Sequence, residues 1–282
     1  MVTVDIIRPD GSKHHLYIDG YLKANMDLAL EHAKKDFDMV FVVDGPEGAG
    51  KSVLTQQVAC YVDPTLCMDR ICFTPDSFSE AVLKAKMYEA VIYDDAYGGL
   101  GSRSSMSDIN KKLVTLLTLI RAKRLFVFIV MPAIFEMDKY PAVWRSRALF
   151  HVTLGPKFQR GFFSFYSSER KKFLYIKGKK FYEYKIKPDF KGRFCKGYYV
   201  DEKEYRNKKQ VELENYDPAK NEGSEKRMNA QRNGIMYALG EKGWTSGEIA
   251  DLITDNSKFK IDERTVRQTI QRHKEKMKED SR

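Results

Sequence analysis

The sequence of 282 residues contains little cysteine and no long apolar run. Its four cysteines lack C-x-x-C spacing and do not cluster with the few histidines, so we expect buried thiols rather than a zinc site or a disulfide framework. The longest apolar run, LFVFIVMPAIF, is about half the roughly 20 residues that a membrane helix requires. The amino terminus lacks the apolar segment of a signal peptide. We therefore expect a cytoplasmic protein, in the host cytoplasm if the source is viral, with no membrane partner.

The positive charge is concentrated in one part of the chain. The formal net charge is +10, with a pI near 9.2. Residues 1–156 carry 18 Lys and Arg against 19 Asp and Glu, whereas residues 157–209 carry 17 against 6. An anionic partner is therefore expected to meet this second segment.

Short apolar runs alternate with helical segments after residue 38. The runs MVFVVD, RICFT, AVIYDD, LFVFIVM and ALFHVTL have the composition of strands buried on both faces, which predicts an α/β core with a parallel sheet. The expected parts are an N-terminal hairpin and helix (1–36), this core (37–155), a basic aromatic antiparallel β extension (156–200), a polar helix and linker (201–225) and a small helical domain (226–282).

A glycine-rich loop follows the first of these runs. The stretch VDGPEGAGKS contains the G-x-x-x-x-G-K-[ST] pattern of a phosphate-binding loop and continues into the helical SVLTQQVACYV. Glycines let backbone N–H groups point towards phosphate, and the helix N-terminus adds positive potential. Lys51 is expected to reach the β and γ phosphates and Ser52 to ligate Mg²⁺. The alternative is a glycine-rich turn that binds no nucleotide. The predicted ATP-binding residues are Gly45, Pro46, Glu47, Gly48, Ala49, Gly50, Lys51, Ser52 and Val53.

The run AVIYDD ends in two acids. Asp94 is placed to hold Mg²⁺ through a water molecule. Asp95 is expected to polarise the water that attacks the nucleotide, although it could instead cap the following turn. Since Asp is shorter than the Glu usual at this position and catalysis is sensitive to displacements near 1 Å, Asp95 is expected to need a partner subunit or DNA to tighten the site.

The motifs resemble those of a known ATPase group. The inserted run RICFT, between the phosphate loop and the acidic strand, is typical of the RecA-like, additional-strand class of P-loop ATPases. At LIRAKRLFVFIVMPAI the chain resembles the FtsK and HerA superfamily of DNA-pumping ATPases and, more loosely, zonula-occludens-toxin-like ATPases of phages and mobile elements. The resemblance covers about residues 39–155. Val130 and Met131 stand where that superfamily has a polar sensor before the proline, here Pro132.

The resemblance implies that Arg121 acts as an arginine finger in a neighbouring subunit. A finger of this kind requires a homo-oligomer, such as a hexamer. Arg103, Arg145 and Arg147 are alternative candidates for the same role.

Aromatic and basic residues are interleaved in residues 158–205, which hold 15 of the 35 aromatic residues. This composition suits nucleic-acid binding. It also suits a small sheet that packs its aromatic face on the core and turns its lysines to solvent.

The C-terminal segment has helical periodicity and resembles a helix-turn-helix or winged-helix domain. GWTSGEIADLI contains a capping box, and the helix from Asp262 places Val266, Ile270 and Met277 on one face. The opposite face carries side chains that read base edges in the major groove. A structural helical bundle is the alternative. The predicted DNA contacts are Arg264, Arg267, Gln268 and Gln271.

These observations predict a P-loop ATP hydrolase that uses ATP and Mg²⁺ to translocate, package or remodel DNA, in a phage or other mobile element. The main alternative is a nucleotide-switched DNA-binding regulator or recruitment factor with slow hydrolysis. A small-molecule kinase is disfavoured, because no acceptor site is evident.

Overall fold

The computed structural model describes residues 2–94, 116, 119–215, 231–256 and 261–279. The chain divides into two compact units, residues 1–216 and residues 217–282. Within the described residues, no helix is both long enough and apolar enough to cross a membrane.

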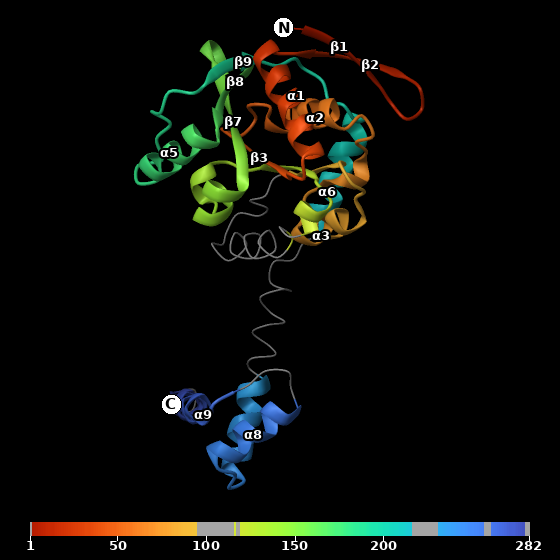
Figure 1. The fold of residues 1–282 in the computed structure, drawn as a ribbon. Helices are drawn as coiled ribbons and strands as arrows, with labels where there is room; N and C mark the ends of the chain where they lie inside the picture. The colour runs from red at the N-terminus through yellow and green to blue at the C-terminus, as the bar shows by residue number, and fades with distance from the viewer. Residues whose placement is uncertain (1, 95–115, 117–118, 216–230, 257–260, 280–282) are drawn as a thin grey trace. The chain divides into compact units, whose positions relative to one another are not determined.

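A seven-stranded mixed sheet forms the centre of the first unit (Figure 1). Five neighbouring strands, in the order β4-β5-β6-β3-β7, run parallel, and β8 and β9 extend the sheet antiparallel beyond β7. The apolar runs become strands because both of their faces are covered. The strands are β3 (Met39–Asp44), β4 (Ile71–Cys72), β5 (Ala90–Tyr93), β6 (Phe126–Val130), β7 (Ser146–Gly155), β8 (Gln159–Ser167) and β9 (Phe190–Arg193). The predicted α/β class and mostly parallel sheet are confirmed.

Two helical layers cover the sheet. Helices α1 (Gly20–Lys34) and α2 (Lys51–Val62) bury their apolar residues in one core with β3, and α3 (Pro75–Lys84) and α5 (Ser168–Gly178) belong to the core of the other face. Helix α6 (Glu202–Asn215) packs beside α3 and β4 through contacts from Lys208 and Glu212. Short helical turns are η1 (Met68–Arg70), η2 (Ile134–Glu136), η3 (Tyr140–Arg145) and η4 (Pro156–Phe158).

The N-terminal hairpin forms as predicted. Strands β1 (Val2–Ile7) and β2 (Lys13–Ile18) pair antiparallel around a turn in which Gly11 has φ 81° and donates to the Arg8 carbonyl at 2.9 Å. A positive φ of this size favours glycine. Ile6, Leu16 and Ile18 are buried in the same core as α1 and α2, so the hairpin is packed on the sheet unit.

Two expectations about the strands need correction, and one is met. The stretch RGFFSFYSSERKKFLYIKGKKFYEYKI contains strand β8 and then helix α5, because Lys171, Leu174 and Tyr175 recur at the spacing of one buried helix face. The predicted antiparallel β extension is present as β8 and β9, which continue the main sheet. RICFT yields only β4 at the sheet edge, whereas the strand lying between β3 and β5 is β6.

The thiols differ in exposure. Cys60 and Cys72 are buried as expected, and burial raises their pKa values, that of Cys72 to about 12. Cys67 is exposed and Cys195 is half-buried, contrary to the expectation of four buried thiols.

The second unit contains three described helices around a small apolar core. They span residues 231–241, α8 (Ser246–Asn256) and α9 (Glu263–Glu279). The predicted capping box is present: the Thr245 amide donates to Glu248 Oε2 at 2.8 Å and the Glu248 amide donates to Thr245 Oγ1 at 3.3 Å. The core residues are Met236, Ile249, Ala250 and Val266, with Leu239, Ile253, Ile261 and Ile270 packed against them.

Candidate functional site

The phosphate-binding motif forms the turn between β3 and α2. Gly45, Gly48 and Gly50 have φ values of 135°, 70° and 102°, a region that disfavours residues with a Cβ. A Cβ on Gly45 would lie 2.2 Å from the Val152 carbonyl oxygen, so β7 also demands glycine there. Gly50 precedes α2 without a side-chain cap. The first N–H groups of α2 therefore keep their capacity to bind an anion.

Two predicted Mg²⁺ ligands meet beside this turn. Ser52, in the first turn of α2, donates from Oγ to Asp94 Oδ1 at 3.1 Å. Asp94 follows β5 directly and is only 2% exposed. Its backbone is fixed by a hydrogen bond from the Asp94 N–H to the Cys72 carbonyl. Lys51 Nζ lies back on the loop, 2.8 Å from the Gly45 carbonyl and 3.1 Å from that of Pro46. The Ser52 hydroxyl, the Asp94 carboxylate and the Lys51 ammonium therefore lie at the carboxyl ends of β3 and β5.

Sequence reasoning missed a tyrosine that contacts Asp94. Tyr205 of α6 donates its hydroxyl to Asp94 Oδ2 at 2.6 Å. Burial, together with the adjacent Asp94 carboxylate, raises the pKa of the Tyr205 phenol, so it remains a donor at neutral pH. Tyr198 packs on the Tyr205 ring at a centroid distance of 4.9 Å. Asp94 is therefore held from two sides, by α2 and by α6.

A cleft of about 670 Å³ opens in front of the loop. That volume lies within the usual range for small-molecule sites. Six of the nine predicted ATP-binding residues line it, together with residues that lie well beyond the predicted ATPase core. The lining residues are Glu47, Gly48, Gly50, Lys51, Ser52, Val53, Asp94, Val130, Arg160, Gly161, Phe194, Cys195, Lys196, Gly197, Tyr198, Glu202, Arg206 and Lys209.

Arg160, at the start of β8, reaches over the phosphate loop. A Cβ placed on Gly48 would lie 3.7 Å from an Arg160 guanidinium nitrogen. Arg160 is exposed in a cleft that also contains Lys51, Lys196, Arg206 and Lys209. The basic residues outnumber Glu47, Asp94 and Glu202, so the cleft suits an anionic ligand.

Residues 194–198 line one wall of the cleft, and the wall segment 194–200 is held by the phosphate-loop helix α2. Gln57 donates from Nε2 to the carbonyls of Cys195 and Gly197 at 2.9 and 3.0 Å. Gln56 Oε1 accepts from the Tyr199 amide at 3.2 Å. The sequence of this wall, GRFCKGYY, lies in the basic aromatic segment. That composition predicts nucleic-acid binding or packing on the core, and it does not indicate that the segment lines a cleft.

Several predicted arginines lie elsewhere. Arg121 is exposed just before β6, at the end where the parallel strands begin and opposite their carboxyl ends beside the phosphate loop, and it does not line the cleft. Arg145 pairs with the buried Asp38 at 2.5 Å, and Arg147 lies 3.7 Å from it, which gives both a structural role at the start of β3. Asp95 and Arg103 lie outside the described residues.

The predicted DNA contacts share one exposed face of α9. Arg264, Arg267, Gln268 and Gln271 are exposed, whereas Val266 is buried. Arg267 forms an ion pair with Glu263 at 2.5 Å. The burial of Met277 lies outside the described side chains.

No protein-family model and no curated protein matches the chain. The described residues include no group of three or more His, Cys, Asp or Glu that could hold a metal ion. Mg²⁺ that enters with nucleotide needs few protein ligands because phosphates and water complete its shell. The pairing of Ser52 with Asp94 fits such an ion.

Proposed function

We propose that the protein is a P-loop ATP hydrolase that binds DNA and couples hydrolysis to DNA translocation, packaging or remodelling in a phage or other mobile element. The observation that carries the ATPase proposal is the hydrogen bond between Ser52 and Asp94 at the mouth of the glycine turn. The position of β6 between β3 and β5 supports the additional-strand class of such enzymes.

The residues predicted for the site, together with Arg160, have the following proposed tasks. The α2 N-terminus and Lys51 bind phosphates, and Ser52 and Asp94 hold Mg²⁺, which neutralises charge that develops during phosphoryl transfer. Asp95 orients the attacking water. Arg160 contacts phosphates within the same chain, and Arg121 acts in trans on a neighbouring subunit of a homo-oligomer.

The proposed DNA interaction is supported by the basic segment and by α9. The exposed residues Arg264 and Gln268 are types that contact guanine and adenine edges. Replacing both with alanine is expected to weaken or relax binding to DNA without changing basal hydrolysis. Measuring binding across several duplex sequences tests this part of the proposal.

The decisive experiment measures ATP hydrolysis alone, with duplex DNA and with single-stranded DNA. DNA is expected to stimulate hydrolysis, Lys51→Ala to abolish it, and Asp95→Asn to abolish turnover while sparing nucleotide binding. Stimulation by a nucleoside or another small acceptor would instead refute the proposal. Hydrolysis without displacement of a triplex third strand would identify a nucleotide-switched regulator rather than a motor.

A further inference from the structure

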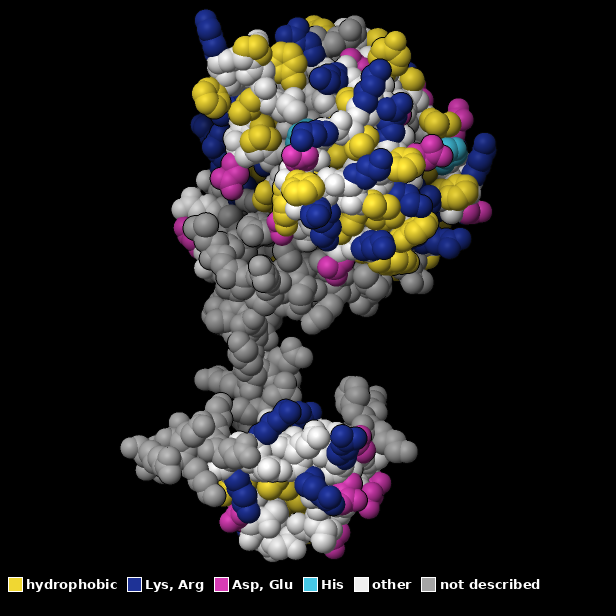
Figure 2. Space-filling view, turned by 90° about the vertical axis from the view of Figure 1, so that its left-hand side faces the viewer, with side chains coloured by type: hydrophobic (Ala, Val, Ile, Leu, Met, Phe, Trp, Pro, Cys, Tyr) yellow, Lys and Arg dark blue, Asp and Glu magenta, His cyan; other side chains and the backbone are white. Residues whose placement is uncertain are grey.

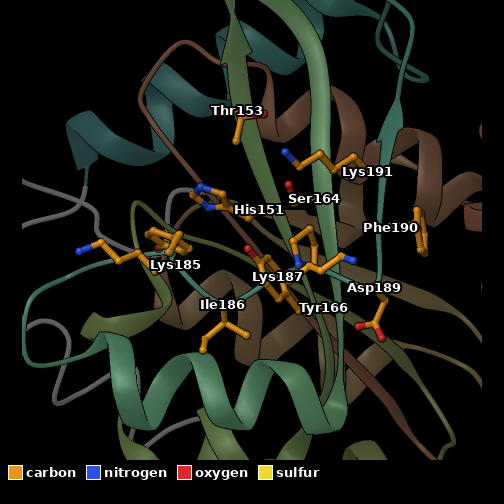
Figure 3. Close-up of a pocket in the computed structure, with 12 residues that line it drawn as sticks. His151, Thr153, Ser164, Tyr166, Lys185, Ile186, Lys187, Asp189, Phe190 and Lys191 are labelled. Carbon is orange, nitrogen blue, oxygen red and sulfur yellow. The ribbon is translucent and has the colours of Figure 1, made fainter.

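A second pocket, of about 610 Å³, shares no lining residue with the nucleotide cleft. It lies on the faces of β7, β8 and β9, with α5 along its lower side in Figure 3. Residues 184–189, in the connection between α5 and β9, line it together with Phe190 and Lys191 of β9. None of the sequence motifs predicted this pocket.

A row of four polar residues crosses the sheet at this pocket. Asp44 of β3 is opposite His151 of β7, His151 is opposite Ser164 of β8, and Ser164 is opposite Lys191 of β9. Directly opposed residues of neighbouring strands share one face of the sheet. His151, Ser164 and Lys191 all line the pocket.

His151 is held in one orientation. Its Nδ1 lies 2.7 Å from Asp44 Oδ1, and the ring of Tyr184 stacks on it at a centroid distance of 3.7 Å. Asp44 Oδ2 also accepts from the Tyr184 hydroxyl at 2.5 Å and from the Ile134 amide at 2.8 Å. Since Asp44 immediately precedes Gly45, this pocket and the phosphate loop are joined through the end of β3.

The charge of the surrounding surface is positive. Residues 168–193 contain ten Lys and Arg against three Asp and Glu. Lys187 and Lys191 are exposed at the pocket. The pocket's acid, Asp189, is engaged by Arg170 at 2.9 Å and accepts from the Ser167 amide at 2.7 Å, so its charge is largely balanced.

Exposed aromatic rings adjoin this basic surface. Trp144 is 60% exposed and Phe181 is 65% exposed, and each lies under a lysine, Lys172 at 4.3 Å and Lys180 at 5.2 Å. Figure 2 shows Lys and Arg side chains interleaved with hydrophobic side chains over the face of the first unit that contains α5. Packing on the core was one of two interpretations of the aromatic residues, but Phe173 is exposed, as is the neighbouring Ile176.

We propose that this pocket and the adjoining face of α5 bind a single strand of nucleic acid. Lysines can neutralise its phosphates, and exposed rings can stack on bases that a duplex would keep paired. The inference rests on the proposed interaction with DNA and assigns that interaction to a surface. Binding here is coupled to hydrolysis through His151 and Asp44.

The test uses the full chain and a fluorescent oligothymidylate, followed by anisotropy over a range of salt concentrations. Neutralising Lys187 and Lys191 together, as Lys187→Gln and Lys191→Gln, is expected to weaken binding about tenfold. It should also reduce the slope of log affinity against log salt by about 1.4, as expected for two lost contacts to single-strand phosphates. The matched control is Lys13→Gln with Lys86→Gln, two exposed lysines that line neither pocket.

Unchanged affinity and salt slope in the Lys187 and Lys191 variant would overturn the proposal. A duplex that binds as tightly as the oligothymidylate, and that loses affinity when Lys187 and Lys191 are neutralised, would overturn the assignment to a single strand. Binding to vesicles of anionic phospholipid without binding to the oligonucleotide would identify a membrane surface instead.

Coupling is tested by hydrolysis with and without the same oligonucleotide. The Lys187 and Lys191 variant is expected to keep basal hydrolysis and lose stimulation, and retained stimulation would refute the coupling. Lys51→Ala should keep oligonucleotide binding. A chain that binds through these lysines but hydrolyses no ATP would disprove the proposed ATPase function and leave this binding site standing.

Discussion

Asp94 accepts hydrogen bonds from elements that are far apart in the sequence. Ser52 is 42 residues away and Tyr205 is 111 residues away. The Ser52 contact could be predicted because the phosphate loop and the acidic strand each carry a local pattern. The Tyr205 contact could not, because no pattern in a polar helix such as EKEYRNKKQ indicates which strand end it will meet.

Tyr205→Phe is expected to raise the Mg²⁺ concentration for half-maximal ATP hydrolysis by about tenfold. The Tyr205 hydroxyl donates to Asp94, the proposed Mg²⁺ ligand, and loss of a partner that orients a metal ligand typically costs 10- to 100-fold in metal affinity. Titration of the hydrolysis rate with MgCl₂ at saturating ATP measures the effect.

Tyr198→Phe is the matched control, because Tyr198 packs on Tyr205 but is not bonded to Asp94. Nucleotide binding without Mg²⁺ should be the same in both variants. An unchanged Mg²⁺ requirement in Tyr205→Phe would show that Asp94 needs no support from α6.

Lys171 is fully buried in α5 and donates to Ser146 Oγ at 2.7 Å and to the Ser146 carbonyl. Burial, assisted by the nearby charge of Arg147, lowers the Lys171 pKa to about 7 from 10.5. The unfolded chain therefore binds more protons than the folded chain between about pH 7 and pH 10.5. Between these pH values, the Lys171 contribution makes the free energy of unfolding rise with pH. Below pH 7, Lys171 is charged in both states, and the cost of burying its ammonium group lowers the free energy of unfolding in full.

Lys171→Met should remove that pH-dependent contribution. The free energy of unfolding of the wild type minus that of the variant is expected to increase from pH 7 to pH 10, by at most about 1.4 kcal/mol per pH unit. Urea unfolding at several pH values measures it. Lys177→Met, at an exposed position of α5, should give a difference independent of pH. A flat difference for Lys171→Met would show that Lys171 stays charged in the fold.

At the scale of elements, five parallel strands and the hairpin were predictable because apolar runs and turn residues are local signals. Helix α5 was not predicted, since aromatic residues alternating with lysines suit a strand as well as a helix. Its buried face is decided by contact with β7 and η3, where Lys171, Leu174 and Tyr175 meet the sheet. Tertiary packing therefore overrode the local pattern.

Two of the three hydrogen bonds described above between α2 and the wall at residues 194–200 come from Gln57. Gln57→Ala removes both hydrogen bonds to Cys195 and Gly197, and is expected to weaken nucleotide binding three- to tenfold, about 1 kcal/mol. The exposed Lys196 should then be cut faster by trypsin. Binding of a fluorescent nucleotide and the rate of cleavage after Lys196 measure the two effects.

Gln210→Ala serves as the control, because Gln210 is exposed on α6 and, among the described residues, bonds only to Glu214 of its own helix. Equal nucleotide affinity and equal cleavage in the two variants would mean that α2 does not hold the wall in place.

At the scale of the whole molecule, the basic segment contributes to the sheet, to the nucleotide cleft and to the second pocket. Arg160 lies over the phosphate loop of its own chain, whereas Arg121 lies just before β6, at the opposite end of the parallel strands. Under the proposed function, the two arginines serve different sites of a homo-oligomer. If so, Arg121 completes the site of a neighbour and Arg160 completes its own.

Mixing inactive variants separates these roles. Arg121→Ala and Lys51→Ala, each expected to lose at least about tenfold in hydrolysis, should recover activity when mixed. The Lys51→Ala subunit retains Arg121 and can donate it to an Arg121→Ala neighbour whose own phosphate loop is intact. Arg160→Ala mixed with Lys51→Ala should not recover, because every active site in that mixture lacks one group from its own chain. If the Arg121→Ala mixture does not recover activity, Arg121 does not act on the neighbouring subunit. If the Arg160→Ala mixture recovers activity, Arg160 is the residue that acts on the neighbouring subunit.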